Sequence, residues 1–212
     1  MTKQEKFSQL IQSAASTKER MFLSAIYLFS AKGFANVGIR ELCRSVNVKE
    51  SAFYNHFASK EDLLVAIFQR FVEISTRKAF SEEELQSIIN TGNIDGYLKE
   101  SIKEFTVCIN NPLYFTILQI IIMESYTNPK AHDMVKNNDY ILHTETVLNM
   151  MMSGGFLKKL DARTVSSSFY YCLKGLMHDV MLKDVWNEDT QELLDMIQKH
   201  VQLFLNLLKL EE

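Results

Sequence analysis

The chain has 212 residues, a net charge of −3 and a hydrophobic fraction of 47%, which suffices for one or two domains with a sizeable core. With only two prolines and seven glycines, long helices are favoured over a turn-rich β fold. The three cysteines, Cys43, Cys108 and Cys172, are far apart and form no Cys-x-x-Cys pair, which argues against a disulfide framework or a zinc site.

The N-terminal segment is polar and basic. Met1 to Lys6 leads into no apolar segment, so we expect no export signal and a cytoplasmic protein. Residues 1–60 contain nine Lys or Arg and four Glu, whereas the remainder contains 14 basic and 22 acidic residues. This asymmetry favours a protein that presents its N-terminal part to a polyanion, although charges also segregate for solubility.

The first strong helix signal is a capping box, in which Ser16 is followed three residues later by Glu19. Apolar residues then recur at helical spacing until Gly33 supplies a stop. These residues are Met21, Phe22, Ala25, Ile26 and Phe29.

Two short helices around a tight turn are predicted next. The second helix covers about residues 39–45, and Asn47 occupies the turn because asparagine tolerates a positive φ. The third runs from about Lys49 to Asn55 or His56, with Ala52 and Phe53 turned inward and Phe57 beyond. The outward side chains of this third helix are Lys49, Ser51, Tyr54, Asn55 and His56.

A second capping box, Ser59 to Asp62, opens a further helix that carries Leu63, Leu64 and Ile67. The order of helix, helix, tight turn, helix and capped helix is that of a helix-turn-helix DNA reader. In such a reader the helix after the turn enters the major groove.

Residues 20–64 resemble the DNA-binding domain of TetR-type (TetR/AcrR) transcriptional regulators, and the spacings agree without an insertion. The matching positions are Phe29, Gly33, Phe34, Ile39, Arg40, Glu41, Leu42, Val48, Phe53, Tyr54, His56, Phe57, Ser59, Lys60, Glu61 and Leu63. The resemblance implies an all-α homodimer, usually a repressor. Its N-terminal three-helix domain reads DNA, and its larger helical C-terminal domain binds an effector and dimerises.

The resemblance also implies roles for single residues. Tyr54 and His56 are expected to bind DNA phosphates, as is Lys60 at the start of the next helix. Arg40 is expected to reach a phosphate or a base. The positions that read base edges are Lys49, Glu50, Ser51, Ala52 and Asn55. Taken singly, Tyr54 packed against Phe57 and His56 as an ordinary surface histidine are the alternatives.

The sequence departs from the family pattern in three places. Val37-Gly38 replaces the usual Thr or Ser before the second helix, which removes a side-chain cap and a phosphate contact. Asn47 replaces the usual turn glycine. Glu50 brings a negative charge near the phosphates, where it would accept a hydrogen bond from a cytosine amine or merely discourage wrong sequences.

The remainder is predicted to be helical, with helices at about 94–109, 113–127, 130–153, 162–184 and 190–209. The domain boundary is expected at residue 62, giving a DNA-binding domain over 1–62 and an effector-binding and dimerisation domain over 63–212. The most apolar run, Ile117 to Met123, is too short to span a bilayer and contains Gln119, so no membrane partner is expected.

The last predicted helix has an apolar arc much wider than a one-sided surface helix needs. A partner helix on each side would cover it, as in a four-helix dimer interface. The alternative is a helix buried inside a larger monomer, and His200 within the arc is expected to lie at the interface or in the core. The candidate interface residues are Ser168, Cys172 and Gly175 on the preceding helix, with Ile197, Val201, Phe204 and Leu208 on the last.

Aromatic and methionine-rich segments lie between these regions. Such stripes are commonly ordinary core, but in an effector-controlled regulator they would line an adaptable apolar pocket. The candidate ligand-binding residues are Phe115, Gln119, Met123, Tyr126, His143, Met151, Tyr170 and Lys174.

No enzyme motif is present. The sequence has no Gly-rich phosphate loop, nucleophile elbow or His-Glu-x-x-His pattern, so we expect no catalysis, no cofactor and no metal. We therefore predict a repressor that a small apolar effector releases from a palindromic operator. The rivals are a helical small-molecule-binding or interaction protein without DNA binding, and an activator whose DNA affinity rises with the effector.

Overall fold

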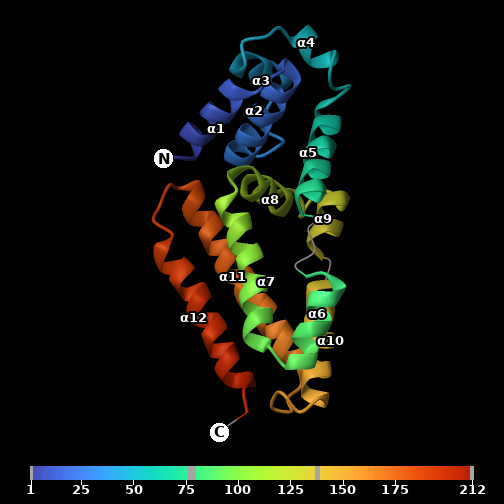
Figure 1. Cartoon of the computed structure of the whole chain (residues 1–212). Helices are drawn as coiled ribbons and strands as arrows, with labels where there is room; N and C mark the ends of the chain where they lie inside the picture. The colour runs from blue at the N-terminus through green and yellow to red at the C-terminus, as the bar shows by residue number, and fades with distance from the viewer. Residues whose placement is uncertain (1, 76–79, 137–138, 211–212) are drawn as a thin grey trace. The chain divides into compact units, whose positions relative to one another are not determined.

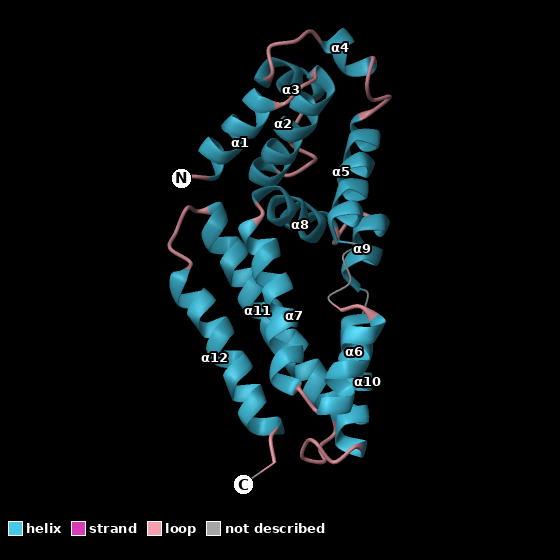
Figure 2. Ribbon diagram, in the orientation of Figure 1, coloured by secondary structure: helices cyan, strands magenta, loops and turns pink. Residues whose placement is uncertain are grey.

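The computed structural model describes residues 2–75, 80–136 and 139–210, and every regular element in these ranges is a helix (Figures 1 and 2). The predicted all-α class is confirmed. The helices are α1 Lys3–Ser13, α2 Thr17–Lys32, α3 Ile39–Ser45, α4 Glu50–Tyr54, α5 Lys60–Ser75, α6 Glu82–Thr91, α7 Ile94–Asn110, α8 Pro112–Glu124, α9 Pro129–Lys136, α10 Asp139–Ser153, α11 Ala162–Val185 and α12 Gln191–Leu208.

The chain forms two compact units. The first unit comprises Met1–Arg77 and Cys108–Lys136, and the second comprises Lys78–Val107 and Asn137–Glu212. Thus α8, α9 and α5, which spans residue 62, belong to the same unit as the predicted DNA-reading helices.

The first unit is built around α2, which packs against α1, α3, α5 and α8. Because α2 has neighbours on several sides, it buries all of residues 21–26. Helix α8 contributes Ile117, Ile120 and Ile121 to the same hydrophobic cluster. Much of the apolar run is therefore core. In the part of the chain that is described, no helix is long and apolar enough to cross a bilayer.

Helix α1, which was not predicted from the sequence, also belongs to the first unit. Thr2 and Glu5 form a capping box at its start. Phe7 is 1% exposed, and its ring lies 5.8 Å from that of Tyr27 on α2. The Lys3 ammonium donates a hydrogen bond to the side-chain oxygen of Gln119 on α8. Helix α1 is therefore tied to both α2 and α8.

In the second unit α11 packs between α10 and α12, and α6 packs on α10. Tyr97 of α7 is 1% exposed, and its hydroxyl lies 3.1 Å from that of Thr144 on α10. The Phe80 ring stacks on Tyr97 at 5.3 Å, and burial raises the pKa of the Tyr97 hydroxyl. Within the helix predicted over 130–153, the described residues form α9 and α10, and residues 137 and 138 between them lie outside the described ranges. Helix α6 is an additional helix that was not predicted.

Candidate nucleic-acid interface

The helix before the reading motif begins and ends at the predicted residues. The Ser16 hydroxyl accepts a hydrogen bond from the backbone N–H of Glu19 at 3.1 Å. The Glu19 carboxylate lies 3.7 Å from the Arg70 guanidinium on α5, an ion pair beyond the simple capping-box prediction. Gly33 ends α2 with a φ of 80°, a conformation that glycine adopts without steric cost.

The turn between α3 and α4 uses Asn47 in the left-handed region, with a φ of 56°. This confirms the role predicted for that residue. The backbone N–H of Val48 donates to the Cys43 carbonyl at 2.9 Å, which closes the turn onto α3. Gly38 precedes α3 and has no side chain to cap it, as the sequence predicted.

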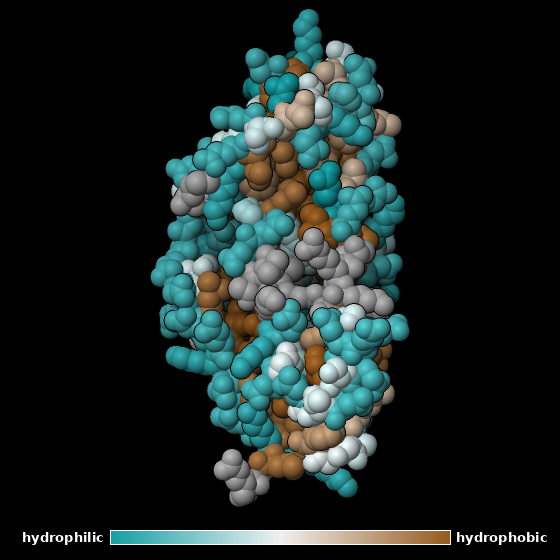
Figure 3. Space-filling model, viewed as in Figure 1, coloured by the Kyte–Doolittle hydropathy of each residue, from teal (hydrophilic) through white to brown (hydrophobic). Residues whose placement is uncertain are grey.

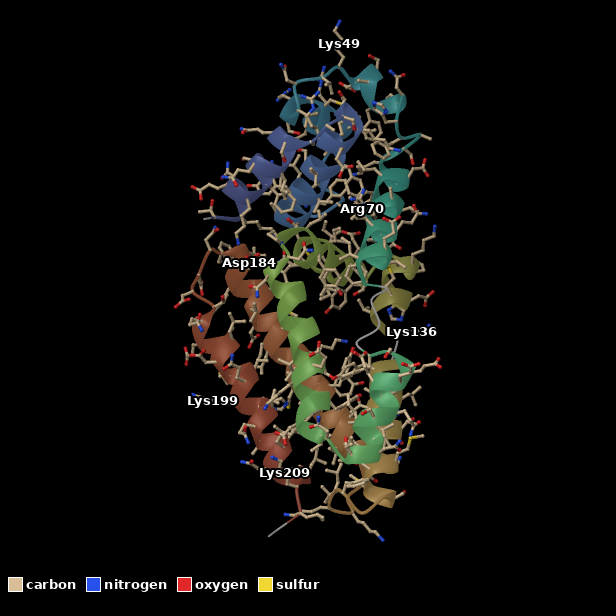
Figure 4. The ribbon with its side chains drawn as sticks, in the orientation of Figure 1. Lys49, Arg70, Lys136, Asp184, Lys199 and Lys209 are labelled. Atoms are coloured by element: carbon tan, nitrogen blue, oxygen red, sulfur yellow. The ribbon has the colours of Figure 1, made fainter. Side chains whose placement is uncertain are left out.

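Helix α4 presents a polar and aromatic face to solvent over a buried base. Phe53 is 0% exposed and Phe57 is 6% exposed, so both anchor the helix in the core of the first unit. Lys49, Ser51, Asn55 and His56 are exposed, as predicted, and so is Glu50, whereas Ala52 is half-buried. Figure 4 shows Lys49 projecting outward, and hydrophilic side chains form much of the visible surface around α3 and α4 in Figure 3.

Tyr54 is exposed to solvent although its ring contacts a buried residue. Its side chain is 58% exposed, and its ring meets the edge of Phe53 at 5.5 Å and 85°. The packing partner found for the ring is therefore Phe53 rather than the Phe57 considered in the sequence. This contact limits the rotation of the ring while the residue stays accessible to a ligand.

Lys60 lies differently from the expected phosphate contact. Its ammonium donates to the carbonyls of Phe34 at 2.9 Å and Val37 at 3.0 Å, and it sits 4.2 Å from the centre of the Phe34 ring. The side chain thus ties the start of α5 to the loop before α3. The sequence did not reveal this because the loop carbonyls carry no side-chain signal.

A depression of about 400 Å³ lies where α3 and α4 meet, lined by Arg40, Arg44, Asn47, Lys49 and Glu50, together with Cys43 and Val48. The Arg40 Nε atom lies 3.2 Å from the Glu50 carboxylate. Burial raises the pKa of the Cys43 thiol, and the charge of Glu50 adds to the effect. Arg44 was not predicted as a site residue, although its position one helical turn after Arg40 signals the shared face.

The eight candidate ligand-binding residues divide between the two units. In the first unit Phe115 and Gln119 are 4% exposed within the core, whereas Met123 is 45% and Tyr126 is 87% exposed. Gln119 is engaged by Lys3. The structure thus brings Phe115 and Gln119 into the core and leaves the other two on the surface.

In the second unit Met151 is buried, His143 and Lys174 are exposed and Tyr170 is half-buried. The Lys174 ammonium lies 5.8 Å from the Tyr170 ring, and Tyr140 lies 5.6 Å from the same ring. Burial raises the pKa of Tyr170. These contacts bring Tyr170 and Lys174 together, while the buried Met151 forms part of the core.

The candidate dimer residues separate into two groups. On α11, Ser168, Cys172 and Gly175 are exposed, and a Cβ atom built on Gly175 would meet nothing within 4 Å. On α12, the four side chains predicted to meet a partner are instead packed inside the subunit, because α12 turns this stripe toward α11. These are Ile197, Val201, Phe204 and Leu208, at 3%, 6%, 7% and 1% exposure.

A neighbouring stripe of apolar side chains on α12 is exposed instead. Met196, Leu203 and Leu207 are 45%, 63% and 46% exposed, and Leu210 continues the stripe.

His200 stacks on Phe169 with ring centres 5.6 Å apart, which places it in the packing between α11 and α12. Over the described ranges, no group of three His, Cys, Asp or Glu side chains is placed to hold a metal ion.

Comparison with known proteins identifies the reading motif. Residues 23–67 match the family model "Bacterial regulatory proteins, tetR family". The HTH-type transcriptional regulator UidR of Escherichia coli K12 is 26% identical over 180 residues, which cover 82% of this chain and 87% of UidR. The uncharacterized HTH-type transcriptional regulator YerO of Bacillus subtilis is 39% identical over 67 residues, and the alignment spans 32% of this chain and 23% of YerO.

The fold is also that of solved regulators. The structure of the SmeT–triclosan complex aligns with a TM-score of 0.62 at 17% identity, covering 92% of each chain. The matched residues 23–67 run from α2 into α5 and include the turn at Asn47 and the exposed face of α4. Residues 23–67 therefore form a helix-turn-helix domain of the type found in the TetR family of bacterial regulatory proteins.

Proposed function

We propose that this protein is a homodimeric repressor of the TetR family that a small molecule releases from a palindromic DNA operator. The observation that carries the proposal is the face of α4, where Lys49, Ser51, Tyr54 and Asn55 are exposed above the buried Phe53. A rigid helix that presents polar and aromatic side chains to solvent suits the major groove. Because the partner is genomic DNA, we expect the protein in the cytoplasm.

The contacts divide into positioning and reading. Tyr54 and His56 are proposed to bind phosphates, which fix the register without reading the sequence. Lys49, Ser51 and Asn55 are proposed to reach base edges, with Ala52 beside them as a small contact to a thymine methyl. We add Arg44 to the phosphate contacts, because it is exposed beside Lys49 in the depression between α3 and α4.

The dimer is proposed to form through α11 and α12. The exposed stripe of Met196, Leu203 and Leu207 supplies apolar surface, and the small exposed residues around Gly175 allow a partner helix to approach closely. Two copies of the helix pair would form a four-helix interface about a two-fold axis. Such symmetry places two reading heads at half-sites roughly 34 Å apart.

The effector is proposed to be a small, largely apolar molecule. The relative SmeT was solved in complex with triclosan, a compound of this kind. Tyr170 and Lys174 remain our candidates for polar contacts in the second unit, because they lie together at its surface. To convert a mostly bound repressor into a mostly released one, an effector must favour the released state about 10⁴-fold, or about 5.5 kcal/mol.

Selection of bound duplexes from a random pool tests the proposal. We expect a two-fold-symmetric sequence, because a dimer with two α4 helices reads the same bases twice. Tyr54→Ala is the matched variant, and it should lower affinity for all sequences while the fold is retained. If the wild-type protein selects no duplex in low salt, the proposal is wrong and a helical binding protein without DNA affinity replaces it.

A further inference from the structure

Arg40 on α3 and Glu50 on α4 form an ion pair across the reading motif. The Arg40 Nε atom lies 3.2 Å from the Glu50 carboxylate, and the two side chains are 80% and 49% exposed. Among the described residues that line the depression there, Glu50 is the acidic one and Arg40, Arg44 and Lys49 are basic. A carboxylate thus stands at the start of the helix proposed to enter the groove.

A carboxylate in this position conflicts with binding to a polyanion unless it is neutralised. In the free protein Arg40 neutralises it. Because both partners are solvent-exposed, the pair is weak and easily exchanged. A DNA phosphate competes well for Arg40, since a guanidinium binds phosphate through two parallel hydrogen bonds. Once Arg40 has moved to a phosphate, the Glu50 carboxylate needs another hydrogen-bond donor.

The major groove offers Glu50 one well-matched donor. The N4 amine of cytosine is a donor without an adjacent acceptor on the same base, whereas the N6 amine of adenine lies beside the N7 acceptor. Guanine and thymine present acceptors that repel a carboxylate. Cytosine therefore satisfies Glu50, and every other base leaves it repelled or poorly paired.

We infer that Glu50 is a specificity-determining residue that selects cytosine at one position of each half-site, with Arg40 as its positioning partner. On a cognate site Arg40 binds a phosphate and Glu50 binds the cytosine amine. On other sequences Glu50 retains Arg40, so that a phosphate contact is lost together with the base contact. This inference rests on the proposed DNA-binding function and adds a named base preference to it.

The test uses the full-length protein and the variants Glu50→Gln, Arg40→Gln and the double variant. Glu41→Gln is the matched control. Glu41 on α3 forms an ion pair with Lys32 on α2 at 2.5 Å, and neither residue lines the depression. Two quantities are measured for each protein. They are the base preference at every position, from selection of a random duplex pool, and the salt dependence of affinity for one random-sequence duplex.

In Glu50→Gln the cytosine preference at one position per half-site should fall about tenfold or move to adenine, which glutamine reads. Affinity for random DNA should rise, and its salt slope should steepen by about one, because Arg40 is freed for a phosphate. In the Arg40→Gln background the same change should no longer steepen the slope. Glu41→Gln should leave base preference unchanged.

The outcomes separate this inference from the proposed function. A wild-type protein that selects no duplex refutes both. A wild-type protein that selects a palindrome, while Glu50→Gln selects the same palindrome with the same preferences, refutes the inference alone. An unchanged salt slope in Glu50→Gln, or equal steepening in the Arg40→Gln background, also overturns it, because Arg40 would then not be the group that Glu50 holds.

Discussion

Lys60 uses two of its three N–H donors within the protein, on the carbonyls of Phe34 and Val37. Val37 is 0% exposed, so its carbonyl has little access to water. The lysine therefore fixes the loop that leads into α3, and through it the orientation of the reading motif. A contact to DNA through the third donor remains compatible with this tether.

Lys60→Met should lower the free energy of unfolding by about 1–2 kcal/mol, because it removes the ammonium donor from both carbonyls and leaves the Phe34 carbonyl only the backbone N–H of Val37. Urea denaturation followed by circular dichroism measures this quantity. Lys130→Met is the control, since that lysine is exposed on α9 in the same unit. Loss of DNA affinity in Lys60→Met at unchanged stability would contradict the tether and favour a phosphate contact alone.

For Tyr54, in contrast to Lys60, we expect an effect on DNA affinity and none on stability. Tyr54→Phe keeps the ring that packs on Phe53 and removes the hydroxyl. Affinity should fall about tenfold on every sequence, as expected for one hydrogen bond to a charged phosphate, without a change in thermal midpoint. Fluorescence anisotropy with two unrelated operators measures the effect. A change confined to one operator would instead make Tyr54 a base reader.

At this scale the sequence predicted what depends on local backbone and helical period. The positive φ of Asn47 and the outward face of α4 are such features. It did not predict the engagement of Lys60 or the pairing of Arg40 with Glu50. Both depend on where a long flexible side chain finds partners across neighbouring elements, which the spacing along one helix does not encode.

The same distinction holds for whole helices. The sequence predicted α11 and α12, which are long and strongly periodic. It did not predict α1 or α6, although each begins with a capping box, at Thr2 and Ser81. These capping boxes could have been used to predict both helices. Helix α1 has few apolar residues, and its stability depends on Phe7, which only the tertiary structure buries against α2.

Phe7→Ala should therefore lower the free energy of unfolding of the first unit by about 3 kcal/mol, since the ring leaves a cavity against α2. Gln9→Ala is the matched control, because Gln9 is exposed on the same helix. Hydrogen exchange of α1 amides measures the change locally. Unaltered protection in Phe7→Ala would show that α1 does not depend on this contact.

His200 predicts a pH dependence of the packing between α11 and α12. Burial lowers the pKa of His200 from its ordinary value of 6.5, and among the described residues its buried Nε2 atom has no hydrogen-bond partner. The unfolded chain therefore binds this proton at a higher pH than the folded chain. Stability is retained above pH 6.5 and is lost as pH falls from 6.5 through the folded pKa.

Urea midpoints at pH 7.5 and pH 5.5 check the sign. The wild-type protein should lose stability at the lower pH, and His200→Phe should lose less, because phenylalanine keeps the stacking on Phe169 without binding a proton. His132→Gln, at an exposed position of α9, is the control. Equal losses in wild type and His200→Phe would assign the pH dependence to other groups.

At the scale of the whole molecule, assembly is decided by which stripe of α12 faces outward. Leu203→Asp should yield folded monomers, because Leu203 is 63% exposed on the proposed interface. Phe204→Asp, one residue away, should instead unfold the subunit, since Phe204 is 7% exposed and packs on Phe169. Sedimentation mass together with circular dichroism separates the two results. A folded monomer from Phe204→Asp and an intact Leu203→Asp dimer would reverse the assignment.

Because α8 and α9 share one core with α2 to α5, the N-terminal part of this protein cannot be exchanged alone with that of another regulator. A chimera joined after residue 62 or residue 77 would strip Ile117, Ile120 and Ile121 from the cluster that holds α2 and α5. The unit that could be transferred is therefore discontinuous in the chain. A biosensor built by exchanging the first unit between regulators must carry residues 108–136 along with the N-terminal segment.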